Sequence, residues 1–202
     1  MGDSNLTSCA INYTAIMSQI GRRIVVYGPA GSGKTYVAAR IAQHIGVPHI
    51  ELDALFWLPE WEEKSLEQFR DDVSAAINEN AGGWVCDGNY GRVRDIILPQ
   101  ADTVVWLRLP FYVVFWQLLK RTVTRSWKGD ILWGYNRESW RQSFLSRDSL
   151  LLYVIKNWGR HIKKIEQDLK EIPHQALFVE LRSVNDTEEF LATLMPATDS
   201  TS

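Results

Sequence analysis

The eight residues from Gly28 to Thr35 constrain this chain more than any other stretch of its sequence. They read Gly-Pro-Ala-Gly-Ser-Gly-Lys-Thr and match the phosphate-loop pattern GxxxxGK[ST] in full. Glycines let the main chain curl until successive N–H groups point at phosphate oxygens, the lysine reaches the β- and γ-phosphates, and the threonine hydroxyl ligates Mg²⁺. The pattern therefore predicts an ATP and Mg²⁺ site made by Gly28, Pro29, Ala30, Gly31, Ser32, Gly33, Lys34 and Thr35.

The segments that flank this loop have the patterns that such a site requires. Residues 24–27 form an unbroken apolar run, which is typical of a strand buried on both faces. After the loop, apolar side chains recur at helical spacing up to Ile45, and Gly46 and Pro48 end that helix. The positive end of the helix dipole adds to the attraction for phosphate.

Further along the chain, short apolar runs alternate with amphipathic helical patterns. We expect strands at residues 49–52, 84–86, 103–109 and 176–181, and helices at 65–77, 111–123, 151–169 and after 186. Strands that alternate with helices indicate an α/β fold with a parallel sheet and right-handed crossovers. Ligands bind such sheets at the carboxyl ends of the strands, where the glycine loop is placed.

The length of 202 residues suits one α/β domain and is short for two. We expect this domain to span residues 21–196, after a loose leader at 1–20 and before a tail at 197–202. The apolar stretch at 103–119 is interrupted by polar residues and a proline, so a membrane span is not expected. The chain is expected to be cytoplasmic and to act as a monomer or homodimer.

Two acidic residues follow predicted strands. Asp87 comes directly after the third strand and is expected to support Mg²⁺, either directly or through a water. Its alternative role is structural, because an Asp-Gly pair favours a turn. Asp53 follows the second strand and is expected to orient or deprotonate a hydroxyl of the acceptor, or to touch the metal. Its alternative role is that of a helix cap.

Positive charge is concentrated in residues 108–170, which contain 13 Lys and Arg against 5 Asp and Glu, a net charge of +8 in a chain of −2. Arg121 and Arg125 share a helix face at i, i+4 spacing and are expected to stabilise the transferred phosphoryl group. A short arginine-rich lid is expected over about 124–148, with Arg137 in contact with the acceptor. The alternative is an ordinary solvated charged surface. Arg92 and Arg94, which follow the third strand, are expected to hold a phosphate of the acceptor.

The chain resembles the adenylate-kinase-like P-loop kinases, and most closely the bacterial DNA topology modulation proteins (FlaR-type). The resemblance runs from about residue 23 to the end, and its narrower markers are Leu-Asp-x-Leu-Phe-Trp at 52–57 and Asp-Gly-Asn-Tyr at 87–90. Further matching stretches lie at 48–51, 101–107 and 119–121. The resemblance implies a three-layer α/β/α fold with a five-stranded parallel sheet of order 2-3-1-4-5.

One departure concerns the acceptor. Adenylate kinases end the third strand with Asp-Gly-Phe-Pro-Arg, whereas this chain has Asn89, Tyr90 and Gly91 after Asp-Gly and places Arg92 one position later. The resemblance therefore leaves the acceptor unassigned. The lid region also lacks the four cysteines that bind zinc in some adenylate kinases, so a structural zinc is not expected.

Two functions follow from these patterns. The favoured one is a phosphotransferase of the nucleotide-kinase type, which moves the γ-phosphoryl group of ATP to a small acceptor such as a nucleotide or nucleoside. The alternative is an ATP-dependent, DNA-associated regulatory protein with little or no kinase activity, which the basic residues interleaved with tryptophans suggest. The net acidity of the chain and its lack of a DNA-binding motif favour the kinase and a small-molecule partner over nucleic acid.

Overall fold

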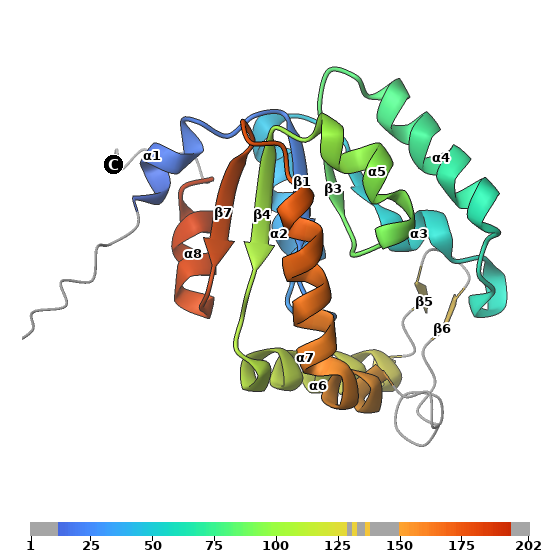
Figure 1. Cartoon of the computed structure of the whole chain (residues 1–202). Helices are drawn as coiled ribbons and strands as arrows, with labels where there is room; N and C mark the ends of the chain where they lie inside the picture. The colour runs from blue at the N-terminus through green and yellow to red at the C-terminus, as the bar shows by residue number, and fades with distance from the viewer. Residues whose placement is uncertain (1–11, 129–130, 133–135, 138–149, 195–202) are drawn as a thin grey trace, which may run out of the picture.

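The computed structural model of the chain describes residues 12–128, 131–132, 136–137 and 150–194. Its centre is a parallel sheet of five strands, whose carboxyl ends lie at the lower edge of the sheet in Figure 1. The strands are β1 (Arg23–Tyr27), β2 (His49–Glu51), β3 (Trp84–Asp87), β4 (Thr103–Leu107) and β7 (Leu177–Leu181). Their order in the sheet is β2-β3-β1-β4-β7, which confirms the predicted α/β fold and the predicted order 2-3-1-4-5.

Helices cover both faces of the sheet and make the layers of the fold (Figure 1). One face packs against α1 (Tyr13–Met17), α2 (Lys34–Ile45) and α8 (Val184–Ala192). The other face packs against α3 (Leu52–Phe56), α4 (Leu66–Glu79), α5 (Arg94–Ile97) and α7 (Leu150–Asp168). A further helix, α6 (Phe111–Lys128), lies across the carboxyl edge of the sheet, and a two-stranded antiparallel ribbon consists of β5 (Ile131–Leu132) and β6 (Asn136–Arg137).

The central strands are apolar on both faces because helices cover both. All five residues of β4 are buried, and so are all four residues of β3. Trp84 is fully buried on one side of the sheet, and Phe190 of α8 is fully buried on the other. Cys86 of β3 is a buried free thiol.

Some boundaries differ from the sequence-based expectations. The second strand ends at Glu51, and the next five residues form α3, because Leu52 and Phe56 at i, i+4 spacing both turn into the core. The fourth strand ends at Leu107 and not at 109, and α6 extends from Phe111 to Lys128, beyond the predicted end at 123. Ser65 caps the amino end of α4, because its Oγ accepts a hydrogen bond from the N–H of Gln68 at 3.2 Å.

Short helices connect the longer elements. They are the 3₁₀ turns η1 (Pro59–Trp61), η2 (Gly91–Val93), η3 (Leu98–Gln100) and η5 (Leu169–Glu171). The segment from η2 to η3, which includes α5, has no counterpart among the predicted elements. Within the described ranges, no helix is both long enough and apolar enough to span a bilayer.

The first helix lies within the segment that was expected to be a leader. Tyr13 of α1 is buried and meets the ring of Phe190 edge-on, with ring centroids 5.9 Å apart. This contact joins α1 to α8 on the face of the sheet that α2 also covers.

Replacing Phe190 with Ala tests the packing on this face. Because Phe190 is fully buried and touches α1, we expect Phe190→Ala to lower the free energy of unfolding by about 3–5 kcal/mol. Tyr112→Ala is the control, since Tyr112 is 65% exposed on α6 and should change stability by less than about 0.5 kcal/mol. Urea unfolding of both variants measures the difference, and equal stabilities would contradict this packing.

Candidate functional site

The glycine loop connects the carboxyl end of β1 to the first residue of α2. Gly31 and Gly33 adopt left-handed φ angles of 86° and 87°, which other residues rarely adopt. A Cβ on Gly31 would lie 2.9 Å from Cβ of Leu118 and 3.2 Å from the carbonyl oxygen of Val114, both in α6. The loop thus takes the curled form that the pattern predicts and packs directly against α6.

The amino end of α2 has the features of an anion site. Its N-cap is Gly33, which offers no side chain to the N–H groups of the first turn, and that turn contains no acidic residue. The side chain of Ser32 is buried, and its hydroxyl has no hydrogen-bond partner among the described residues. Together with the neighbouring Lys34, these groups fit a polyphosphate.

Three side chains meet at the end of β3. The Thr35 hydroxyl donates to Oδ2 of Asp87 at 2.7 Å, and Nε2 of His49 lies 2.7 Å from Oδ1 of the same carboxylate. Asp87 is 1% exposed, so these contacts take the place of water around its two oxygens. Its side chain therefore joins β3 to α2 and β2.

The chemistry of this cluster fits Mg²⁺. Magnesium prefers oxygen ligands, and Thr35 and Asp87 provide a hydroxyl and a carboxylate side by side. A hydroxyl has one proton and two lone pairs, so Thr35 can donate to Asp87 and still offer a lone pair to a cation. These two residues are the ones expected from the sequence to hold the metal.

Asn89 fixes the start of the glycine loop. Its side-chain oxygen accepts from the N–H of Gly28 at 3.3 Å, and its Nδ2 donates to the carbonyl oxygen of Gly28 at 2.6 Å. The amide therefore ties the loop after β3 to the loop after β1. The sequence marks Asn89 as part of the Asp-Gly-Asn-Tyr stretch and as a departure from the adenylate-kinase pattern, but it gives no sign of this contact with Gly28.

His161 of α7 also contacts Asn89, and nothing in the sequence indicates this contact. Its Nε2 lies 3.3 Å from Nδ2 of Asn89. Burial lowers the pKa of His161, and the positive charges of Lys34 and Lys164 lower it further. A single His beside the apolar stripe of α7 carries no sequence signal of this contact, because only the packing of α7 brings it to the loop.

Asp53 lies in the first turn of α3 and accepts a hydrogen bond from the Tyr90 hydroxyl at 2.6 Å. The ring of Tyr90 packs against Phe56 and Phe69, with centroids 4.9 and 5.2 Å away. Burial and the neighbouring Asp53 carboxylate raise the pKa of Tyr90 above its usual range, so the phenol keeps its proton and remains a donor. The hydrogen bond holds Asp53 in place at the end of β2.

The predicted arginines have different surroundings. Arg92 is 60% exposed and lies 3.9 Å from Glu63, and Arg121 is half-buried on α6. Arg94 is bound by Asp168 and Glu171, so the expectation that it holds an acceptor phosphate is replaced by a structural ion pair. The backbone positions of Arg125 in α6 and Arg137 in β6 are described, but their side chains and most of the predicted lid lie outside the described residues.

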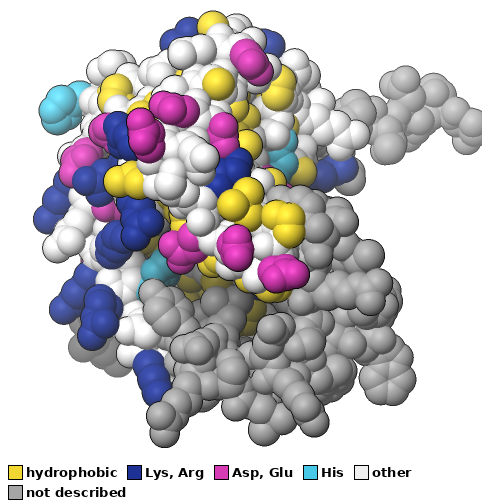
Figure 2. Space-filling model, turned by 90° about the vertical axis from the view of Figure 1, so that its right-hand side faces the viewer, with side chains coloured by type: hydrophobic (Ala, Val, Ile, Leu, Met, Phe, Trp, Pro, Cys, Tyr) yellow, Lys and Arg dark blue, Asp and Glu magenta, His cyan; other side chains and the backbone are white. Residues whose placement is uncertain are grey.

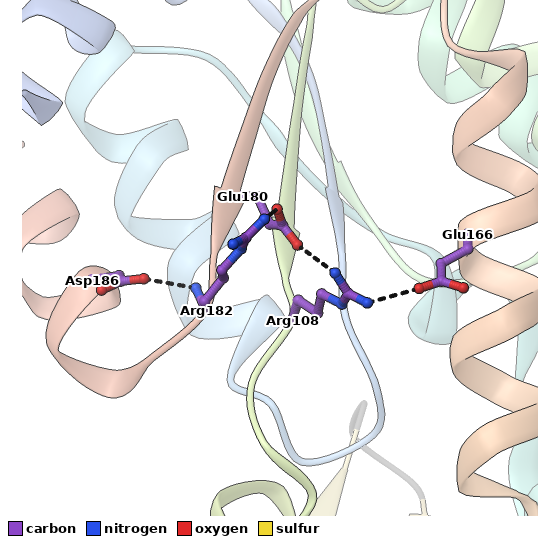
Figure 3. Close-up of polar contacts among 5 residues, drawn as sticks. All are labelled: Arg108, Glu166, Glu180, Arg182 and Asp186. Carbon is purple, nitrogen blue, oxygen red and sulfur yellow. Dashed lines mark hydrogen bonds and ion pairs between the residues drawn. The ribbon is translucent and has the colours of Figure 1, made fainter. Parts of the chain in front are cut away.

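An ion-pair network flanks the site at the end of β4 (Figure 3). Arg108 binds Glu166 of α7 at 3.0 Å and Glu180 of β7 at 3.2 Å. The guanidinium of Arg182 also binds Glu180, at 2.6 Å. The backbone N–H of Arg182 donates to Oδ2 of Asp186 at 2.8 Å. Two basic side chains of this edge are therefore compensated by carboxylates, which joins α7, β7 and the start of α8.

Other basic residues remain at the surface. On the face of the molecule drawn in Figure 2, many Lys and Arg side chains lie toward the left, with Asp and Glu side chains beside them and nearer the centre. Exposed basic residues of α7 are Lys156, Arg160, Lys163 and Lys164. Among the described residues of the basic segment 108–170, Arg108 is paired with carboxylates, whereas these four basic residues of α7 are exposed.

Comparison with known proteins agrees with this architecture. Residues 24–86, less than half of the chain, match the model of the ATPase family associated with various cellular activities (AAA). This stretch contains β1, the glycine loop, β2 and nearly all of β3. No match is found among curated protein sequences.

Solved structures with a similar shape include three kinases. Shikimate kinase from Acinetobacter baumannii in complex with shikimate is 14% identical, with a TM-score of 0.50 over 90% of this chain and 94% of that chain. A gluconokinase from Sinorhizobium meliloti 1021 is 22% identical, with a TM-score of 0.46 over 87% and 93% of the two chains. Shikimate kinase from Bacteroides thetaiotaomicron is 16% identical, with a TM-score of 0.48 over 86% and 95%.

Identities this low bear on the fold alone, and the first of these structures shares it over most of both chains. The sheet order, the loop geometry and this likeness lead to one conclusion: the chain has the P-loop NTPase fold.

Asn89→Ala tests the contact that holds the glycine loop. The variant loses both hydrogen bonds to Gly28, which is buried, so we expect the free energy of unfolding to fall by about 1–3 kcal/mol. The amide of Gly28 should also exchange its hydrogen faster. Asn185→Ala on the exposed side of α8 is the matched control, and equal effects of the two substitutions would contradict the role of Asn89.

His161→Gln tests the electrostatics beside the loop. The folded state lowers the pKa of His161, so the unfolded chain binds the proton more readily and His161 destabilises the fold as the pH falls through about 6.5. We therefore expect the stability of the wild type relative to His161→Gln to fall below pH 6.5, by at most about 1.4 kcal/mol per pH unit. Urea unfolding at pH 5, 6 and 7 measures this, with the exposed His174→Gln as control, and a difference independent of pH would contradict it.

Proposed function

We propose that this chain is an ATP-dependent phosphotransferase that moves the γ-phosphoryl group of ATP to a hydroxyl of a small acceptor. The observation that carries the proposal is the hydrogen bond between Thr35 and the buried Asp87, directly beside an uncapped helix end and Lys34. A phosphate loop with these partners suits a nucleotide triphosphate and its metal. The acceptor is a nucleotide, a nucleoside or another small hydroxyl compound.

Each residue has a specific part in this proposal. The N–H groups of residues 28–35 bind the phosphates, and the Lys34 ammonium neutralises the β- and γ-phosphate oxygens. The Thr35 hydroxyl ligates Mg²⁺, and Asp87 supports it directly or through a water. When bound, Mg²⁺ neutralises the charge that develops between the β- and γ-phosphates.

The acceptor side of the reaction belongs to Asp53. Its carboxylate lies at the end of the strand next to β3, held by Tyr90, and is in a position to accept the proton of an acceptor hydroxyl. Arg92 and Arg137 bind the acceptor, and Arg121 and Arg125 stabilise the transferred group. Residues 21–196 form the domain that does this, and its kinship is with the bacterial DNA topology modulation group.

Lys34→Ala tests the phosphate side of the proposal. Loss of the ammonium removes a charge-assisted contact to the transferred group, and we expect phosphoryl transfer to fall by at least about 100-fold. Lys163→Ala, an exposed lysine of α7, is the control and should retain activity. The measurement is transfer of label from γ-labelled ATP to a panel of nucleotides, nucleosides and small hydroxyl compounds.

The same panel decides the proposal as a whole. A folded wild-type chain that labels no acceptor, or a Lys34→Ala variant as active as the wild type, would contradict a phosphotransferase.

A further inference from the structure

His49 also binds the Asp87 carboxylate, and the proposed reaction gives it no part. It is the first residue of β2 and lies outside every pattern that points to phosphate binding. Glu51 pairs directly with Asp87 in the parallel register, so His49 is the diagonal neighbour of Asp87. Alternation along a strand places both side chains on the face of the sheet that α2 covers.

The hydrogen bond between His49 and Asp87 has a defined direction. An ionised carboxylate can only accept, so Nε2 of His49 carries a hydrogen and donates to Oδ1 at 2.7 Å. Oδ2 accepts from the Thr35 hydroxyl at 2.7 Å. The two donors therefore bind one oxygen each and fix the plane of the carboxylate.

Burial makes this arrangement costly to disturb. Asp87 is 1% exposed and the side chain of His49 is 20% exposed, so water replaces a lost donor poorly. Without the N–H of His49, Oδ1 would lack its partner and the carboxylate could turn about its Cβ–Cγ bond. The Thr35 hydroxyl would then turn with the carboxylate, because the hydroxyl donates its hydrogen bond to Oδ2 of Asp87.

We propose that His49 is a positioning residue for Mg²⁺, which acts through Asp87 on the Thr35 hydroxyl. His49 fixes Asp87, Asp87 accepts the hydrogen bond of the Thr35 hydroxyl, and the lone pairs of Thr35 then face the amino end of α2, where the phosphates bind. Partners of this kind behind metal ligands typically contribute 10- to 100-fold to metal affinity. This inference rests on the proposed binding of Mg²⁺ and ATP, and it adds a residue that no phosphate-loop pattern contains.

Two variants separate the hydrogen bond from the volume of the ring. His49→Met fills the space without a donor, and His49→Gln keeps an N–H group close to the position of Nε2. His44→Met, on the exposed side of α2, is the matched control. Urea unfolding checks that each variant is folded before binding is compared.

The measurement is the Mg²⁺ concentration that half-saturates the gain in ATP affinity, taken from fluorescent-ATP titrations. We expect His49→Met to raise it by about 10- to 100-fold. His49→Gln and His44→Met should stay within about threefold of the wild type, and ATP binding without Mg²⁺ should not change.

A second measurement uses the metal-free protein. The ring N–H of His49 should exchange slowly with solvent in proton NMR spectra, and Asp87→Ala should make that exchange fast.

The outcomes are distinct. If the wild type binds no ATP with Mg²⁺, the proposed function fails. If the wild type binds but His49→Met needs no more Mg²⁺ than it does, only the role of His49 fails. Equal losses in the Met and Gln variants would also overturn that role, because the ring and not its donor would then be what matters.

Discussion

The site depends on the buried carboxylate of Asp87. A carboxylate removed from water is tolerated only where hydrogen bonds compensate it, and here Thr35 and His49 bind one oxygen each. These partners come from α2 and β2, so the contact fixes the position of the helix against two strands. The amino end of α2 is held in this way beside the glycine loop, where an anion would bind.

The parallel sheet explains why the residues of the candidate site lie together at its carboxyl edge. Every strand of the sheet ends at the same edge. The glycine loop follows β1, Asp87 is the last residue of β3, and Asp53 lies in the helix that follows β2. Asn89 ties two of these loops together, and Tyr90 holds Asp53 within the third. The glycine loop and Asp53 are thus held by two consecutive residues, Asn89 and Tyr90.

The fold class could be predicted from the sequence because its signals are local. Few other structures explain the apolar run of β1, the glycine loop and the apolar stripe of α2. The alternation of predicted strands and helices indicated a parallel sheet. The strand order came from a resemblance to known kinases and not from any local pattern. Thr35 and Asp87 could be expected together, because both follow strands that end at one edge.

The contacts of His49, Asn89 and His161 could not be predicted in the same way. Each joins elements far apart in the chain, and a lone His or Asn has the same local pattern whether it is solvated or buried. Arg94 shows the opposite case, since its position after β3 suggested a phosphate ligand while α7 supplies Asp168 as its partner. Side-chain pairing of this kind is decided by tertiary packing.

A crystal structure with Mg²⁺ and a non-hydrolysable ATP analogue tests the central claim most directly. The account predicts β- and γ-phosphates wrapped by residues 28–35, Lys34 beside them, and the metal on the Thr35 hydroxyl while Asp87 keeps its bond to His49. A nucleotide bound away from this loop, or a metal that does not touch Thr35, would contradict it.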